Sequence, residues 1–279
     1  MAKVLNESWK NWATENLGLG IPAQKIFETL VNNDFDLNDI EKVMKESGEK
    51  YSASKTTKSI SPNIRTSNHI EGATKVDVPD DALDLYTIDN FISAADCKVL
   101  IDLIKSDMKK STVSFATEAE GHYDDKVRTS STCNLRRVSN EVVKKVDNLI
   151  LECIGIHESR GESIQGQHYD KTQEFKQHTD TFAPNSEEYK LHAENHGGQR
   201  TWTFMIYLNS TRKGGETKFK RIKDADGNEL SFKPKTGRAV VWNNLKPDGS
   251  PNPYSLHQGC PVESGEKIII TKWFRERKI

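Results

Sequence analysis

Three side chains in the second half of the chain have the types and spacing to bind one metal ion. His178 and Asp180 stand two positions apart, and in an extended chain such residues project to the same face, so an imidazole and a carboxylate can converge. His257 follows 79 residues later (257 minus 178), after a turn-rich segment with two prolines. Two imidazoles and one carboxylate on one face of an ion leave the opposite face open, which suits ferrous iron reacting with dioxygen.

A lysine follows these three residues closely in the sequence. Lys267 comes ten residues after His257 (267 minus 257), within an alternating segment typical of a strand. A 2-oxo acid that chelates the iron would need a buried cation for its distal carboxylate. Taken singly, Lys267 is also typical of the polar side of a half-exposed strand, and His-x-Asp of a solvated surface pair. The four residues together favour the interpretation as a site.

The bulk composition bounds the class of protein. The chain has 279 residues, which suits two domains, and its formal net charge of -1 provides no global field for nucleic acid or anionic lipid. The first residues lack the apolar core of a signal peptide and no apolar run approaches a bilayer span, so no membrane partner is expected. Scattered cysteines without a C-x-x-C pair argue against a zinc ribbon or a disulfide framework and predict a cytoplasmic protein: Cys97, Cys133, Cys153 and Cys260.

Residues 1–47 are expected to form a small helical module. Apolar residues recur at helical spacing in three short segments, which contain Trp9, Phe27 and Val43. The module is expected to bind a protein partner or a second subunit, or to pack on the main domain as a solvated cap. Residues 48–82 are rich in Ser, Thr, Lys, Asn and Pro with few large apolar groups, so a flexible linker is predicted there.

Residues 83–279 are predicted to form the main domain. A strand over 85–88 precedes a helix capped by Ser93, with Asp96 in the capping-box position, and a second helix follows the cap candidates Ser139 and Asn140. Short strands separated by glycine-rich turns are predicted over 201–208, 216–219, 238–242 and 266–274. We therefore expect a mainly β fold with flanking helices and a double-stranded β-helix (jelly-roll) core.

Further motifs stand in a fixed order around the candidate site. In chain order they are Tyr169, His178-x-Asp180, His196-Gly-Gly-Gln-Arg200, Tyr207-Leu-Asn209, Gly214-Gly-Glu-Thr217, Pro234-x-x-Gly237-Arg238-Ala239, His257 and Gly265-Glu-Lys267. This order resembles the prolyl 4-hydroxylase branch of the Fe(II)- and 2-oxoglutarate-dependent oxygenases. The resemblance covers residues 83–279 and does not extend to the N-terminal helices.

The resemblance implies how the cofactor and cosubstrate are held. The two histidines and the aspartate described first would ligate Fe(II). Lys267 would pair with the far carboxylate of 2-oxoglutarate, Tyr169 would hydrogen-bond the same carboxylate, and Thr271 would line that pocket.

The resemblance also implies two residues that contact substrate. Arg200 occupies the family's position for gripping the peptide, and Trp273 would wall the proline site. As residues alone, a surface arginine and a core aromatic are equally typical interpretations. The segment 115–132 lies where the family has a mobile loop that closes over substrate, and Phe175 replaces the family's tyrosine, which loses one hydroxyl near the cosubstrate.

The implied activity is hydroxylation of a prolyl residue in a peptide or protein, in which O₂ and 2-oxoglutarate are consumed and succinate and CO₂ released. Ascorbate is a candidate reductant. Two alternatives stay open: hydroxylation of another residue or a small molecule, and a binding module whose oxygenase site has decayed. A third, a zinc site on His192-x-x-x-His196, is disfavoured because the glutamate between them is misplaced and Gly197-Gly198 breaks a helix.

Overall fold

The computed structural model describes residues 4–18, 23–32, 35–46, 73–111, 128–135, 140–184, 186–246 and 248–279. The chain divides into two compact units, residues 1–60 and 61–279, and each has its own arrangement of elements. Most of the predicted linker, the cap candidate Ser139 and residues 115–127 of the predicted loop lie outside the described residues.

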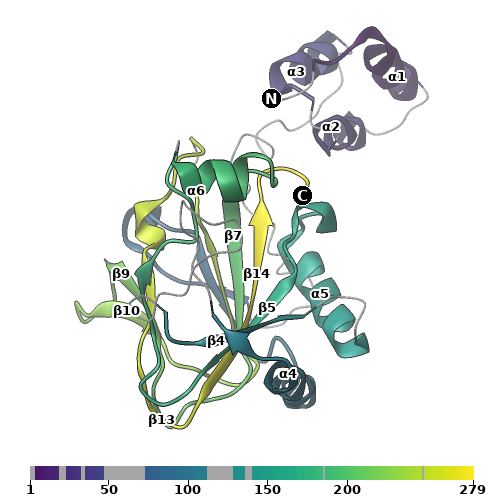
Figure 1. The fold of residues 1–279 in the computed structure, drawn as a ribbon. Coiled ribbons are helices and arrows are strands. Elements are labelled where there is room, and N and C mark those ends of the chain that lie inside the picture. The colour runs from purple at the N-terminus through teal and green to yellow at the C-terminus, as the bar shows by residue number, and fades with distance from the viewer. Residues whose placement is uncertain are drawn as a thin grey trace. The chain divides into compact units, whose positions relative to one another are not determined.

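Three helices form the first unit, as their apolar spacing predicted. Their apolar faces meet in one core, where Phe27, Leu30 and Ile40 are almost fully buried. Trp9 contributes an edge-on ring contact to Trp12, with ring centres 5.3 Å apart. The helices are α1 (Glu7–Gly18), α2 (Ala23–Asn32) and α3 (Leu37–Glu46) (Figure 1).

An eight-stranded antiparallel sheet is the larger layer of the second unit. Its strand order, β1-β2-β11-β7-β14-β5-β4-β3, places β14 and β7 in the centre. The strands are β1 (Ala73–Lys75), β2 (Leu85–Ile88), β3 (Lys109–Lys110), β4 (Ser131–Leu135), β5 (Ile164–Tyr169), β7 (Arg200–Tyr207), β11 (Ala239–Asn243) and β14 (Lys267–Arg275). Strand β1 falls inside the segment 48–82 predicted as linker. It lies at the edge of the sheet and pairs with β2 among the described strands, and an edge strand does not need the apolar alternation by which a central strand is predicted.

A four-stranded sheet, in the order β10-β9-β12-β6, forms the second layer. Strands β8 and β13 form a separate two-stranded pair. Side chains from both sheets share one core that includes Tyr207, Phe219 and Trp242. The predicted double-stranded β-helix is therefore confirmed. These strands are β6 (Phe175–His178), β8 (Lys213–Gly214), β9 (Thr217–Lys223), β10 (Glu229–Phe232), β12 (His257–Gly259) and β13 (Val262–Ser264).

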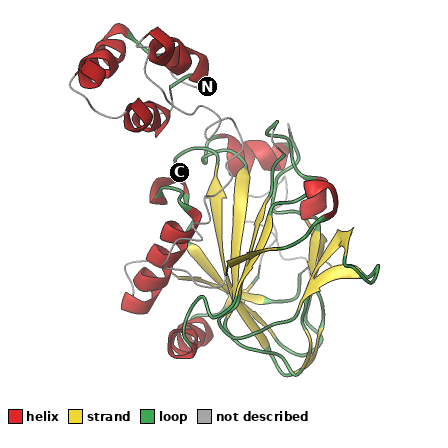
Figure 2. Ribbon diagram, turned by 180° about the vertical axis from the view of Figure 1, so that it is seen from behind, coloured by secondary structure: helices red, strands yellow, loops and turns green. Residues whose placement is uncertain are grey.

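Two helices, α4 (Ala94–Ser106) and α5 (Glu141–Ile154), cover the outer face of the large sheet (Figure 2). The predicted caps are present, because Ser93 accepts a hydrogen bond from the Asp96 amide and Asn140 accepts one from the Val142 amide. Gly166 of β5 allows the close approach of α4, since a side chain there would clash with Ile104. Both faces of the central strands are thereby buried.

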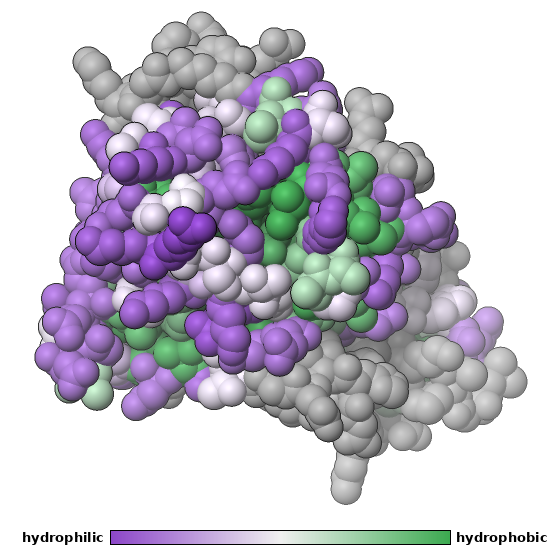
Figure 3. All heavy atoms as spheres, turned by 90° about the horizontal axis from the view of Figure 1, so that it is seen from below, coloured by the Kyte–Doolittle hydropathy of each residue, from purple (hydrophilic) through white to green (hydrophobic). Residues whose placement is uncertain are grey.

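The remaining short elements connect the strands. Hydrophilic residues predominate on the face of the molecule drawn in Figure 3, with apolar side chains visible between them. None of the helices in the described ranges has the length and apolar character needed to cross a membrane. The connecting elements are η2 (Pro79–Asp81), η4 (Glu158–Arg160), α6 (Glu187–Tyr189), η5 (Lys190–Glu194) and η6 (Pro253–Ser255).

Candidate active site

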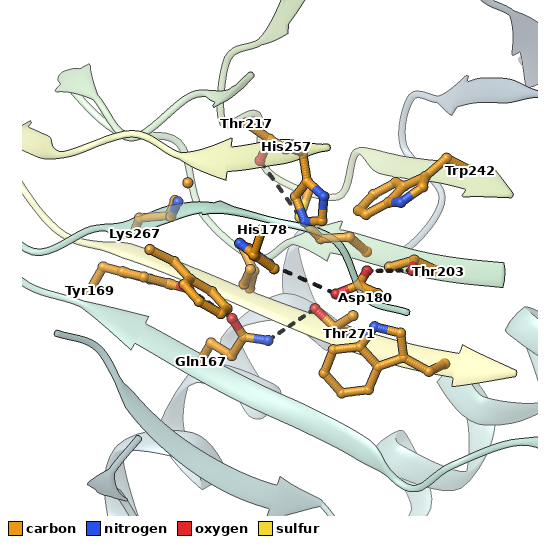
Figure 4. Close-up of a pocket in the computed structure, with 15 residues that line it drawn as sticks. Gln167, Tyr169, His178, Asp180, Thr203, Thr217, Trp242, His257, Lys267 and Thr271 are labelled. Atoms are coloured by element: carbon orange, nitrogen blue, oxygen red, sulfur yellow. Dashed lines mark hydrogen bonds and ion pairs between the residues drawn. The ribbon is translucent and has the colours of Figure 1, made fainter. Parts of the chain in front are cut away.

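The two candidate histidine ligands come together by strand pairing. His178 ends β6, His257 begins β12, and they are direct partners in the antiparallel register. Their ring centres lie 4.3 Å apart. Asp180 follows β6, and the metal-binding atoms of the three side chains all lie within 4.8 Å of one another. The structure thus assembles the predicted ligand set between the two sheets (Figure 4).

Hydrogen bonds orient each ligand. Nδ1 of His178 lies 2.7 Å from the carbonyl oxygen of Lys176, and Nδ1 of His257 lies 2.8 Å from that of Ser255. A ring nitrogen next to a carbonyl must carry the proton, so the lone pair of Nε2 is available in both rings. Thr203 donates to Oδ2 of Asp180 at 2.6 Å. These contacts fix the imidazoles and the carboxylate in the form that binds a cation.

The electrostatics of the site favour a bound cation. Burial, together with the neighbouring charge of His257, lowers the pKa of His178 to about 3, which keeps its ring neutral. Burial alone would raise the pKa of Asp180, but electrostatic interaction with His257, His178 and Arg200 lowers it. A neutral imidazole and an ionised carboxylate are the states in which these groups bind metals.

A β-bulge adds an aromatic wall. Residues three positions apart point to opposite faces of a regular strand. The register of β6 against β12 shifts between His178 and Phe175, which accounts for both rings facing the same side. The ring of Phe175 stacks on that of His178 at 3.6 Å between centres and 15° between planes. The residue that departs from the family pattern therefore contacts a candidate ligand.

A buried lysine lies in the same pocket. Lys267, the first residue of β14, is 1% exposed, and its Nζ lies 4.3 Å from the ring centre of Tyr169. Within the described part of the chain, its ammonium group makes no hydrogen bond and no ion pair. Burial lowers the pKa of Lys267 to about 8. Since a buried charge without a partner is costly, this lysine is suited to an anionic ligand.

Gln167 connects the other two predicted cosubstrate residues. The Tyr169 hydroxyl donates to Oε1 of Gln167 at 2.8 Å, and Nε2 of Gln167 donates to the Thr271 hydroxyl at 3.2 Å. All three side chains line the pocket that holds the metal ligands and Lys267. Sequence reasoning missed Gln167, although its place two residues before Tyr169 in the same strand was a usable signal.

Arg128 is a further buried group that sequence reasoning treated only as part of a loop. Its Nε donates to the Ser130 hydroxyl at 3.0 Å, and its guanidinium lies 4.7 Å from the ring centre of Phe175. Burial lowers the pKa of Arg128, against the opposing effects of Tyr169 and Asp180. The polar composition of its surroundings in the sequence gave no sign of burial.

The two predicted substrate residues are in contact with each other. The guanidinium of Arg200 lies 4.0 Å from the ring centre of Trp273, and Trp273 lines the metal pocket. Arg200 is absent from that lining and instead makes a two-pronged ion pair with Glu162, at 2.7 and 2.8 Å. The pair was not visible in the sequence, because 38 residues separate its members.

The disfavoured zinc alternative has no support among the described residues. His192 and His196 belong to neither of the three-residue groups there that could hold an ion. The second such group is His168, Asp170 and Glu266, where Glu266 lies 2.7 Å from His168 and also 2.7 Å from Lys105. This group is a charge network in which the lysine already offsets one carboxylate.

The donor set fits ferrous iron, and the unpaired lysine fits a second carboxylate. Two neutral imidazoles and one carboxylate, with open positions, are the preferred ligands of non-haem iron oxygenases. Lys267 in the same pocket provides the charge that the distal end of a chelating 2-oxo acid requires. The fold and this pocket together define the class of 2-oxoglutarate-dependent iron oxygenases.

Comparisons with known proteins agree. Residues 164–275 match the family model of the 2OG-Fe(II) oxygenase superfamily. "Probable prolyl 4-hydroxylase 3" of Arabidopsis thaliana is 34% identical over 67% of this chain and 68% of its own length. "Prolyl 4-hydroxylase 5" of the same plant is 36% identical over 66% of each chain. The crystal structure of a viral collagen prolyl hydroxylase from Paramecium Bursaria Chlorella virus-1 superposes with a TM-score of 0.51 and 25% identity, over 76% of this chain and 99% of that one.

This chain belongs to the prolyl 4-hydroxylase family of the 2OG-Fe(II) oxygenases. Its cofactor is Fe(II), and its cosubstrates are 2-oxoglutarate and O₂. The resemblance predicted from the motif order is confirmed.

Proposed function

We propose that this protein hydroxylates prolyl residues of a peptide or protein, with iron held by His178, Asp180 and His257. The names of its relatives support the prolyl substrate. The observation that carries the proposal is one pocket that contains both a preoriented two-histidine, one-carboxylate set and the unpaired Lys267. A binding module with a decayed oxygenase site would have no reason to retain either.

When bound, the iron supplies the oxidising chemistry that couples conversion of 2-oxoglutarate into succinate and CO₂ to transfer of an oxygen atom. The protein contributes binding and orientation. Lys267 neutralises the far carboxylate of 2-oxoglutarate, Tyr169 donates a hydrogen bond to it, and Thr271 lines the pocket around it. Tyr169 must exchange its bond with Gln167 for this role, which its rotatable hydroxyl permits.

Apolar walls restrict what reaches the reacting atoms. Phe175, Trp242 and Trp273 line the pocket beside the polar groups. In this proposal Trp273 walls the prolyl ring, and Arg200 binds the peptide on the far side of that indole. Exclusion of water from such a pocket strengthens the electrostatic interactions within it and protects reactive species.

The test is incubation of the protein with Fe(II), 2-oxoglutarate and short proline-containing peptides in air. We expect succinate and a gain of about 16 Da on proline, the mass of one oxygen atom. His178→Ala and Asp180→Ala should abolish both turnover and iron retention. A mass gain confined to other residues would refute prolyl hydroxylation and leave the iron site standing. Failure to form any succinate, even without peptide, would favour a decayed site.

We further propose that ascorbate sustains turnover as reductant and that the protein resides in the cytoplasm. We also propose that residues 1–47 act as a helical module and 83–279 as the oxygenase domain, with a linker shorter than the predicted 48–82, because β1 belongs to the large sheet. The four cysteines are all free, which supports a reducing compartment. The separate core of the three helices supports an independent role for them, such as binding a partner or a second subunit. The dependence of turnover on ascorbate tests the first proposal, and imaging of a tagged chain tests its location. Pull-down with and without residues 1–47 tests whether the helices bind a partner.

A further inference from the structure

A second cavity adjoins the metal pocket. Trp273 lines the metal pocket, and the guanidinium that contacts its ring, that of Arg200, lines the second cavity. Phe182, two residues after a metal ligand, has two guanidiniums near its ring centre, that of Arg200 at 5.5 Å and that of Arg275 at 5.4 Å. The polar and aromatic lining consists mainly of Glu162, Phe182, His192, His196, Arg200 and Arg275.

The charges of this cavity do not cancel. Arg200 and Arg275 bring two positive charges, and Glu162, which contacts both, brings one negative charge. One positive charge is therefore left over among the lining side chains; the terminal carboxylate of Ile279, which also lines the cavity, makes no ion pair with the described residues. The other side-chain carboxylate near Arg275 is that of Glu276. It accepts a hydrogen bond from the Gln199 amide and lies 3.9 Å from the guanidinium of Arg277. Its charge is thus offset by a neighbour outside the cavity lining.

Several donors of the cavity are unused. Arg200 bonds Glu162 through Nε and Nη2, while Arg275 uses Nη1 for the carbonyls of His192 and Gly198. Within the described ranges, Nη1 of Arg200 and Nη2 of Arg275 make no hydrogen bond. Nε2 of His192 is buried and also has no partner there. Buried polar groups are normally satisfied, so the His192 nitrogen indicates a missing partner, and the two guanidinium nitrogens are available to an acceptor in the cavity.

We propose that this cavity binds an acidic side chain of the peptide, so that the enzyme prefers prolines flanked by aspartate or glutamate. The inference rests on the proposed prolyl hydroxylation and specifies its substrate class. A carboxylate would supply the absent negative charge and accept hydrogen bonds from the free guanidinium nitrogens. The ring of Phe182, which lines the cavity, would pack against it.

The test compares labelled peptides with one proline and amidated ends, which carry Glu or Gln at each flanking position in turn. Binding is measured by fluorescence anisotropy on the full-length protein with Fe(II) and 2-oxoglutarate under nitrogen, where no turnover occurs. At one position we expect the Glu peptide to bind at least about tenfold more tightly than its Gln counterpart. Arg275→Gln should reduce this preference to less than about twofold.

Arg221→Gln is the control, because Arg221 is an exposed arginine of β9 outside the cavity lining; it should keep the preference. Equal binding of Glu and Gln peptides at every position by the unmodified protein would overturn the inference without reliance on any variant. So would tight binding of a Gln peptide with a free C-terminus, which would identify the terminal carboxylate as the ligand. If the preference is observed but proline is not hydroxylated in air, the proposed function fails and the cavity assignment stands.

Discussion

Replacement of Lys267 by methionine should have opposite effects on ligand binding and on stability. The side chain keeps its length and loses its charge, at a site where it is 1% exposed. Truncating one partner of a buried charge pair costs about 2–5 kcal/mol. Since about 1.4 kcal/mol is a factor of ten, the KM for 2-oxoglutarate should rise by about 30-fold or more.

The apo protein should instead become more stable. Burial lowers the pKa of Lys267 from 10.5 to about 8. A shift of about 2.5 units corresponds to roughly 3 kcal/mol of destabilisation of the folded state wherever the lysine is charged. This penalty is fully present below pH 8 and disappears as the pH rises from 8 towards 10.5, because the folded form then gives up its proton before the unfolded chain does.

The assay is urea unfolding of the apo Lys267→Met protein and the parent from pH 7 to pH 10, together with succinate formation at varied 2-oxoglutarate. The stability gain of the variant should be largest near pH 7 and shrink above pH 8, where the pKa of Lys267 lies. An unchanged KM would refute the assignment of this lysine to the cosubstrate. A loss of apo stability would refute the claim that its charge is uncompensated.

Three further predictions concern a metal ligand, the residue that orients another ligand, and a buried ion pair of β14. His257→Ala should lose iron, measured by metal analysis after gel filtration, and full turnover in this variant would refute the ligand set. Thr203→Val should weaken iron affinity by about 10- to 100-fold in a chelator competition, because the threonine orients Asp180; unaltered affinity would contradict this. Lys272→Met should lower the stability measured in urea, since it removes the 2.7 Å ion pair with buried Asp147, and the double variant with Asp147→Leu should be more stable than the single variant.

The metal ligands were accessible from the sequence because their chemistry restricts residue type and order together. His178 and Asp180 needed only an extended chain to converge, and His257 was recognisable by the motifs around it. The helix caps could be predicted equally well, since Ser93 and Asn140 accept hydrogen bonds from amides two or three residues away in the sequence. Local interactions of this kind leave a local signal.

What escaped prediction depends on register and long-range contacts. The stacking of Phe175 on His178 follows from a bulge, which no composition rule reveals. The contact between Glu162 and Arg275 joins residues 113 positions apart (275 minus 162). An isolated glutamate or arginine is typical of a solvated surface, and only the tertiary fold shows that these two are buried together.

The pairing of β6 with β12 should depend on whether iron is bound. Strand β6 is the edge of its sheet, and a slip of one residue would turn the imidazole of His178 away from that of His257. An ion shared by both strands favours one register by mass action, and that restraint is absent from the apo chain. Iron starvation should therefore loosen the register of β6 on β12 as well as stop turnover.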